Sequence, residues 1–183
     1  MRKLIASEMV TVDGFFAGPN GEVEWHNVDA EFNDYANEML NSADTILFGR
    51  VTYQLLADYW PSPQAIKDDS IIANKMNNLP KIVFSKTLPS VEWQNTRLVK
   101  ENIAGEISEL KQQPGKDMVI FGSGSIVSAF MQFGLIDEYR IIVNPVVLGN
   151  GIPLFRNIKS RINLKLLKTK SFGSGNVILY YKP

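Results

Sequence analysis

Three short segments constrain the fold of this chain most, because in each one an apolar, strand-like run leads directly into small or basic residues. They are Thr45–Thr52, Lys81–Thr87 and Met118–Val127. In an α/β sheet the carboxyl ends of the strands lead into helix amino termini, where free backbone N–H groups and the helix dipole favour an anion such as a nucleotide phosphate. Three such ends in one chain therefore predict a dinucleotide site.

The bulk composition is that of an ordinary globular protein and excludes several classes of function. The 183 residues suit one domain, 1–183, and the formal net charge is zero, so no global field would draw the chain to nucleic acid or to an anionic membrane. No cysteine is present, which excludes disulfides, thiolate catalysis and cysteine-ligated zinc, and no metal site is expected. The amino terminus lacks a signal-like apolar stretch, and no apolar run approaches membrane-spanning length. We therefore expect a cytoplasmic location.

Strand-like runs alternate with helix-like ones along the chain, which predicts an α/β fold. Besides the apolar run before Gly49, the expected strands are 4–12, 81–85, 96–100, 117–121 and 138–143, and the expected helices are 28–40, one from Arg50 to before Pro61, 66–78, 103–112 and 125–133. The runs 164–172 and 177–181 are separated by a Gly-Ser-Gly-Asn turn, which is typical of an antiparallel hairpin. We expect one mixed, largely parallel sheet that is flanked by helices and closed by this hairpin.

The glycine-rich segment after the run 117–121 is the strongest candidate for a phosphate loop. Gly122 and Gly124 match the first two glycines of a Rossmann fingerprint, but Val127 stands where the third glycine belongs, and no Gly-Lys-Ser or Gly-Lys-Thr of a Walker loop occurs. Small residues still let the backbone approach a diphosphate, and a helix that begins near Ser125 would direct N–H groups at it. A tight strand-to-helix turn without any ligand explains this segment as well.

Two cationic positions favour a phosphate at the other strand ends. Arg50 opens a helix, where a cation is unfavourable with respect to the dipole unless an anion offsets it, and Thr52 adds a hydroxyl. Ser85 and Lys86 follow another strand, and no acid stands there to bind a ribose 2′-hydroxyl. This cationic cluster favours NADP over NAD. The alternative for each residue is an ordinary exposed side chain.

The order of these motifs resembles the dihydrofolate reductase superfamily, and most closely its bacterial branch that is related to the C-terminal reductase domain of the bifunctional riboflavin-biosynthesis deaminase/reductase. The resemblance spans residues 4–181 and rests on the segments Val12-Asp13-Gly14, Trp25 before an acidic helix, Ile46–Thr52, Ile82–Lys86, Val119–Gly124 and Asn144–Phe155. It implies a three-layer fold with an NADPH site along the carboxyl edge of the sheet.

The resemblance also assigns residues to that cofactor. The positions that match the family's cofactor site are Phe48, Gly49, Arg50, Thr52, Ser85, Lys86, Gly122, Ser123, Gly124, Ser125 and Ile126. Dihydrofolate reductases begin the diphosphate loop with a Gly-Gly pair whose peptide bond is cis, and here the pair is Gly122-Ser123. A serine at the second position is similar to the riboflavin branch.

For the substrate, the resemblance points to Asp29 as the catalytic carboxylate. It lies four residues after Trp25, close to the offset at which dihydrofolate reductases carry the helix acid that holds the pterin. Asp13 and Trp25 are the expected substrate-binding residues. A first-turn acid stabilised by the helix dipole is an equal explanation of Asp29, and the proton could instead come through Asp13 or Glu24.

Two further residues bear on whether the domain is catalytic. His26 is the only histidine, and we expect a solvated loop residue rather than a catalytic acid. Glu8 lies in the first strand, where the folate enzymes have apolar residues near the nicotinamide, and this difference favours a domain that binds the cofactor without turnover.

The sequence thus predicts an NADPH-dependent reductase that transfers a hydride to a C=N or C=O of a small pterin-like or ribosylated aminopyrimidine-like substrate. The alternative is a non-catalytic or stress-related dimeric nucleotide-binding domain that retains the cofactor pocket. Many apolar residues between Glu138 and Phe155, and in the closing hairpin, favour a homodimer, as in the riboflavin branch.

Overall fold

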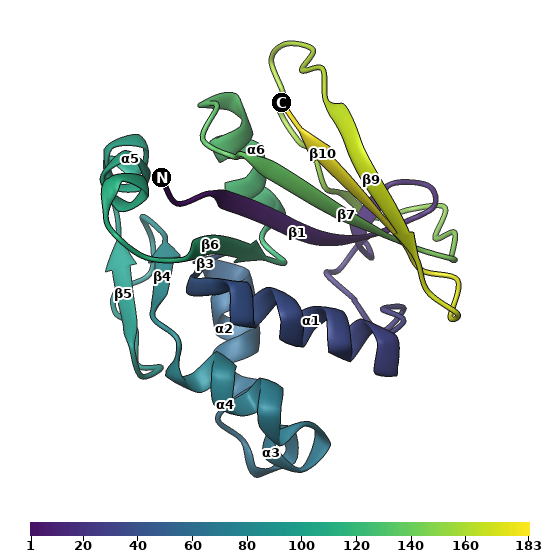
Figure 1. Cartoon of the computed structure of the whole chain (residues 1–183), viewed down its shortest axis with the longest axis horizontal. Coiled ribbons are helices and arrows are strands. Elements are labelled where there is room, and N and C mark those ends of the chain that lie inside the picture. Colours follow the sequence, from purple (N-terminus) through teal and green to yellow (C-terminus); the bar gives the residue numbers. More distant parts are fainter.

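The computed structural model describes residues 1–183 and is built on an eight-stranded sheet (Figure 1). The strands are β1 (Leu4–Thr11), β3 (Ala43–Gly49), β4 (Lys81–Phe84), β5 (Thr96–Val99), β6 (Asp117–Phe121), β7 (Glu138–Asn144), β9 (Lys165–Ser171) and β10 (Val177–Lys182). Their order is β5-β4-β3-β6-β1-β7-β10-β9. The six strands from β5 to β7 are parallel, whereas β10 pairs antiparallel with both β7 and β9. The predicted mixed sheet and the closing hairpin are therefore confirmed.

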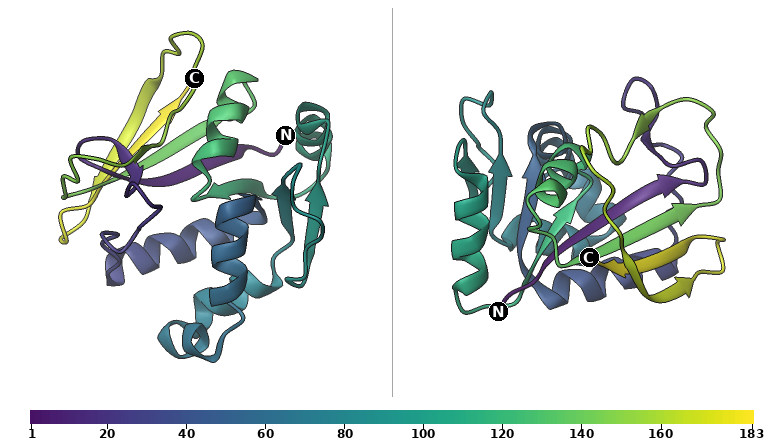
Figure 2. Two further views of the ribbon diagram at one scale, coloured as in Figure 1. Left: turned by 180° about the vertical axis from the view of Figure 1, so that it is seen from behind. Right: turned by 90° about the horizontal axis from the view of Figure 1, so that it is seen from above.

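Helices cover both faces of the sheet and enclose two apolar cores (Figures 1 and 2). Helices α1 (Ala30–Ser42), α2 (Arg50–Tyr59) and α4 (Ser70–Asn78) cover one face, and α5 (Ile103–Gln112) and α6 (Gly124–Gln132) cover the other. Alternate strand residues point to opposite faces, so Phe48 packs towards α1, α2 and α4 while Leu47 packs towards α5 and α6. None of the helices is long and apolar enough to cross a membrane.

One local expectation was wrong, and one small sheet was not predicted. The single helix expected over 66–78 is two helices, α3 (Pro63–Asp68) and α4, because the side chain of Asp69 accepts hydrogen bonds from the N–H groups of Ile71 and Ile72 and so begins a new helix. The structure also adds a small antiparallel sheet of β2 (Phe15–Ala17) and β8 (Ile152–Pro153). Segments of two or three residues are too short for a periodic pattern to reveal them.

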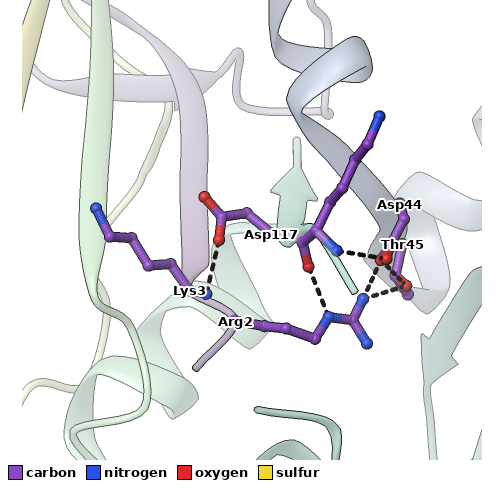
Figure 3. A network of polar contacts seen from close by, with 6 residues as sticks. Arg2, Lys3, Asp44, Thr45 and Asp117 are labelled. Atoms are coloured by element: carbon purple, nitrogen blue, oxygen red, sulfur yellow. Dashed lines mark hydrogen bonds and ion pairs between the residues drawn. The ribbon is translucent and has the colours of Figure 1, made fainter. Parts of the chain in front are cut away.

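A polar network joins the amino ends of three neighbouring strands (Figure 3). The Arg2 guanidinium pairs with Asp44, donates to Thr45 Oγ1 at 2.8 Å, and donates to the Lys116 carbonyl oxygen at 2.6 Å. Next to it, the Lys3 N–H donates to Asp117 Oδ1 at 2.8 Å. These contacts hold the starts of β1, β3 and β6 together, so this end of the sheet is occupied by structural contacts and the strands' other ends remain for ligands.

Candidate functional site

The carboxyl end of β6 lies at a topological switch point. Its neighbours β3 and β1 both lead to helices on one face of the sheet, α2 and α1, whereas β6 leads to α6 on the opposite face. Ligands of open α/β sheets bind where adjacent strands diverge in this way. The strands of all three segments that the sequence singled out end at this edge, at Gly49, Phe84 and Phe121.

The amino termini of α2 and α6 lie against each other at this edge, and we call them the α2/α6 corner. The Gly49 N–H donates to Ser123 Oγ at 2.9 Å, and Thr52 Oγ1 donates to the Gly122 carbonyl oxygen. A Cβ added at Gly49 would stand 3.2 Å from Ser125 Oγ and 3.3 Å from Ile126 Cγ2, so the first turn of α6 packs tightly against this residue. Gly122 has φ +59°, in the left-handed region that favours glycine.

Neither helix of the α2/α6 corner is capped by a side chain. Helices α1, α3 and α4 have N-caps whose side chains accept from the first turn, whereas Gly49 and Ser123, like Asn102 before α5, provide no such bond. Unlike α5, neither α2 nor α6 has an acid in its first turn. Ser123 Oγ is used elsewhere, since it accepts from Gly49 and donates to the Phe121 carbonyl oxygen at 3.2 Å. Two uncapped helix termini thus present free N–H groups and positive dipole ends at one place, which is an arrangement suited to an anion.

Other predicted cofactor residues differ in what they can offer. Arg50, Lys86 and Ser125 are exposed, and neither cation forms an ion pair. Phe48 is wholly buried and stacks on Trp93 with ring centroids 6.0 Å apart, so only its backbone can reach a ligand.

The rest of the predicted cofactor set forms the frame of the loops. Gly124 and Ile126 are buried in the first turn of α6. Ser85 Oγ accepts from the N–H groups of Thr87 and Leu88 at 3.2 and 3.0 Å, which fixes the turn that carries Lys86. The chain has no cis peptide bond, so the Gly122-Ser123 bond is trans.

The predicted substrate residues lie at the same edge of the sheet but two strands further along, beside β7. The Asn27 N–H donates to the Asn144 Oδ1 at the end of β7 at 2.8 Å, which places the segment with Trp25 and Asp29 there. Asp29 is the N-cap of α1, and its Oδ1 accepts from the Phe32 N–H at 2.8 Å. Trp25 is half-buried, and its indole N–H donates to the Glu22 carbonyl oxygen at 3.2 Å.

Asp13 binds the loop that follows β7. Its carboxylate accepts from the Thr11 hydroxyl at 2.6 Å and from the N–H groups of Leu148 and Gly149 at 3.3 and 2.8 Å. The Thr11 hydroxyl is the main reason that the pKa of Asp13 is lowered, and the Gly149 and Leu148 N–H groups act in the same direction. Asp13 is exposed and ionised, and its contacts hold the β1 turn against the 145–150 loop.

His26 is not the solvated residue that its loop position suggested. It is half-buried, the Trp25 ring meets it edge-on at 4.5 Å, and its Nε2 is buried without a hydrogen-bond partner. Burial lowers the pKa of His26 to about 4, against a smaller opposing effect of the Glu24 charge. The imidazole is therefore neutral near pH 7 and is not poised to act as a general acid there.

Glu8 is the residue that the motif analysis did not assign to the site. It is 1% exposed in the middle of β1, its Oε1 accepts from the Ser123 N–H at 3.4 Å, and its Oε2 has no partner. Burial raises the pKa of Glu8 well above its usual value, and the Ser123 N–H opposes this only in part. The sequence signal was a single charged residue inside an otherwise uncharged strand, which is unusual because charged groups are almost never fully buried without a partner.

One cavity of the protein lies away from this edge. Its volume is about 400 Å³, and it is lined by Asn74, Asn77, Asn78, Trp93 and other polar side chains near the amino ends of β4 and β5. Trp93 Nε1 donates to Asn77 Oδ1 at 2.8 Å, so these groups already hold one another.

Comparison with known proteins agrees with the architecture. The RibD C-terminal domain family matches residues 2–178. The uncharacterized protein YyaP of Bacillus subtilis (strain 168) is 39% identical over 182 residues, which cover 98% of this chain and 94% of YyaP.

Solved structures share the fold at lower identity. A putative riboflavin biosynthesis protein from Shewanella sp. PV-4 aligns with TM-score 0.76 and 23% identity over 98% of each chain. Dihydrofolate reductase from Enterococcus faecalis, solved with NADP(H), aligns with TM-score 0.64 and 15% identity over 98% of this chain and 95% of that one. The fold is thus that of the dihydrofolate reductase-like proteins, and the chain belongs to the RibD C-terminal domain family.

Proposed function

We propose that this protein is an NADPH-dependent reductase that transfers a hydride to a C=N or C=O of a small pterin-like or ribosylated aminopyrimidine-like heterocycle. The observation that carries the proposal is the α2/α6 corner, where two uncapped helix termini meet beside the switch point of the sheet. A dinucleotide needs such a place for its diphosphate. The nicotinamide would supply the hydride, and the chain's own residues would bind and orient the cofactor and the substrate and deliver a proton to the product.

The exposed cations of this edge support NADPH over NADH. Arg50 stands in the first turn of α2, its guanidinium donates only to Gln54 Oε1 at 3.1 Å, and Lys86 stands on the turn after β4. A 2′-phosphate would give both side chains the anionic partner that they lack. The Thr52 hydroxyl and Ser85 hold the two turns that carry these cations.

The substrate end of the proposed site is the segment beside β7. Trp25 offers an aromatic face for a planar ring, and Asp29 offers a carboxylate at the start of α1. Its Oδ1 holds the Phe32 N–H, which leaves Oδ2 for a substrate or for a water that carries the proton. Hydride transfer requires the two carbons at van der Waals contact, so orientation by these residues would supply much of the rate enhancement.

Calorimetry tests the cofactor assignment. We expect NADPH to bind at least about tenfold more tightly than NADH at one salt concentration, which corresponds to about 1.4 kcal/mol. Arg50→Ala should remove most of this preference. Lys182→Ala, which removes the same charge from an exposed position at the opposite edge of the sheet, should keep it. Equal affinities of the wild-type protein for the two cofactors would refute the assignment.

The second candidate is a non-catalytic or stress-related nucleotide-binding domain. The observation in its favour is that both expected substrate carboxylates have structural partners, Asp29 as a helix cap and Asp13 in the 145–150 loop. The two functions differ in turnover, so NADPH oxidation against a panel of pterins and aminopyrimidines separates them. Tight NADPH binding without oxidation by any member of the panel would favour the binding domain.

Both candidates include a homodimer. Val147, Phe155, Leu166 and Leu167 are exposed apolar side chains of the carboxyl-terminal part of the chain, and a symmetric partner would cover them. Light scattering at micromolar concentration checks this, and a monomer mass would contradict it.

A further inference from the structure

Glu8 is the ionisable group of the sheet's interior that lies next to the α2/α6 corner. The last position that β1 shares with β6 is Ser7, which pairs with Phe121, and beyond it β1 pairs with β7 alone. Glu8 is thus the first residue of β1 past the end of β6, where the chain turns at Gly122 into α6. Its carboxyl group is aimed at the amino terminus of that helix, since Oε1 accepts from the Ser123 N–H at 3.4 Å.

No charged group compensates this carboxyl. Helix α6 contains no ionisable residue, and Asp117 and Glu138 lie at the amino ends of β6 and β7. Tyr139 pairs with Ala6, and Arg140 pairs with Ser7 but points to the other face of the sheet, where its guanidinium lies over the Tyr180 ring. Arg140 is already paired with Glu138. No charge contributes to the pKa of Glu8, which burial raises, and Oε2 has no partner at all. The neutral acid is therefore the form that this environment favours.

The N–H groups at the start of α6 are also those that the proposed function gives to the diphosphate. An ionised Glu8 would draw the Ser123 N–H to itself and place a negative charge at the positive end of the helix. A diphosphate at the same terminus would then meet a like charge in a poorly solvated place, where repulsion is strong. The neutral acid imposes neither effect.

We propose that Glu8 is a proton-linked positioning residue of the α2/α6 corner. When Glu8 is neutral, the start of α6 is free to bind the cofactor's diphosphate; when Glu8 is ionised, its carboxylate competes with the diphosphate for that helix terminus. The inference rests on the proposed function, because it concerns the same site. It requires a definite proton balance: where free protein has lost the Glu8 proton, binding of NADPH returns one proton from solvent to a Glu8 carboxylate oxygen. Glu8 acts through the Ser123 N–H and needs no contact with the ligand.

Titration calorimetry with NADPH between pH 7 and pH 9, in two buffers of different ionisation enthalpy, tests this. Over this range the 2′-phosphate is at least about nine-tenths ionised, since phosphate monoesters have a second pKa of about 6. We expect the affinity to fall with rising pH, by up to about tenfold per pH unit above the pKa of Glu8 in the free protein, with uptake of up to one proton per NADPH. Glu8→Gln, which has the same shape and no proton to lose, should bind with little pH dependence and no proton uptake.

Glu109→Gln makes the same chemical change at an exposed position of α5 and should behave as the wild type. If Glu8→Gln does not fold, the wild-type measurement still decides, because binding without proton uptake at every pH from 7 to 9 overturns the inference. NADPH binding with the same pH profile in the wild type and Glu8→Gln also overturns it and leaves the proposed reductase intact. Failure of both proteins to bind NADPH at any pH overturns the proposed function together with the inference.

Discussion

The buried state of His26 predicts a specific loss of stability in acid. Burial lowers the pKa of His26 to about 4 from an ordinary value of 6.5. Below pH 6.5 the unfolded chain therefore binds a proton that the folded protein excludes, so this residue's contribution to stability is complete above the unfolded pKa and falls as the pH drops towards 4. From the difference between the two pKa values, we expect the free energy of unfolding to fall by about 2.5 kcal/mol when the pH is lowered from 7.5 to 4.5.

The assay compares urea unfolding of the wild type and His26→Gln at these two pH values. Carboxylates also titrate in this range, but they are common to both proteins, so the difference between the two pH dependences isolates His26. We expect the wild type to lose about 2.5 kcal/mol more than the variant. Because His26 is the only histidine, its ring proton can be followed by NMR without assignment, and its titration midpoint should lie near 4. A midpoint near 6.5 with parallel stability profiles would refute the argument.

Three further predictions concern the site and its support. Asp29→Asn should keep the α1 cap, because asparagine caps as well as aspartate, and should leave NADPH affinity unchanged while lowering reduction of an identified substrate by about a hundredfold. Unchanged turnover would show that Asp29 serves only as the helix cap. Gly122→Ala should cost about 1–2 kcal/mol in thermal unfolding and weaken NADPH binding, since φ is +59° and a Cβ would stand 3.3 Å from Thr52 Cγ2; unchanged stability and binding would contradict the strained turn. Lys81→Met should lower the free energy of unfolding in urea by about 3 kcal/mol, because the buried ammonium donates to the carbonyl oxygens of Met76, Asn77 and Leu79 at 2.8–3.0 Å and these oxygens would lose their donor. A loss below about 1 kcal/mol would show that water replaces the ammonium.

The sequence determined most of the elements because their signals are local. The helix 103–112 and the strand 117–121 were predicted at the bounds that the structure has, and the other principal elements differ by one or two residues at their ends, apart from the helix pair α3 and α4. Apolar spacing, glycines and prolines act between neighbours in the chain, so they can be recognised without the fold. The same is true of the three strand ends that form the candidate cofactor edge.

The tertiary structure alone decided how these parts meet. Gly49 and Ser123 are 74 positions apart, and Glu8 and Ser123 are 115 apart, so their contacts depend on the strand order β3-β6-β1 and on the opposite faces to which α2 and α6 pass. The sequence contained the glycine, the serine and the acid, but whether a carboxyl group is solvated or buried against a helix terminus depends on what packs around it. Local pattern therefore determined where an anion could bind, and long-range packing determined which helix termini converge there and which acid lies beside them.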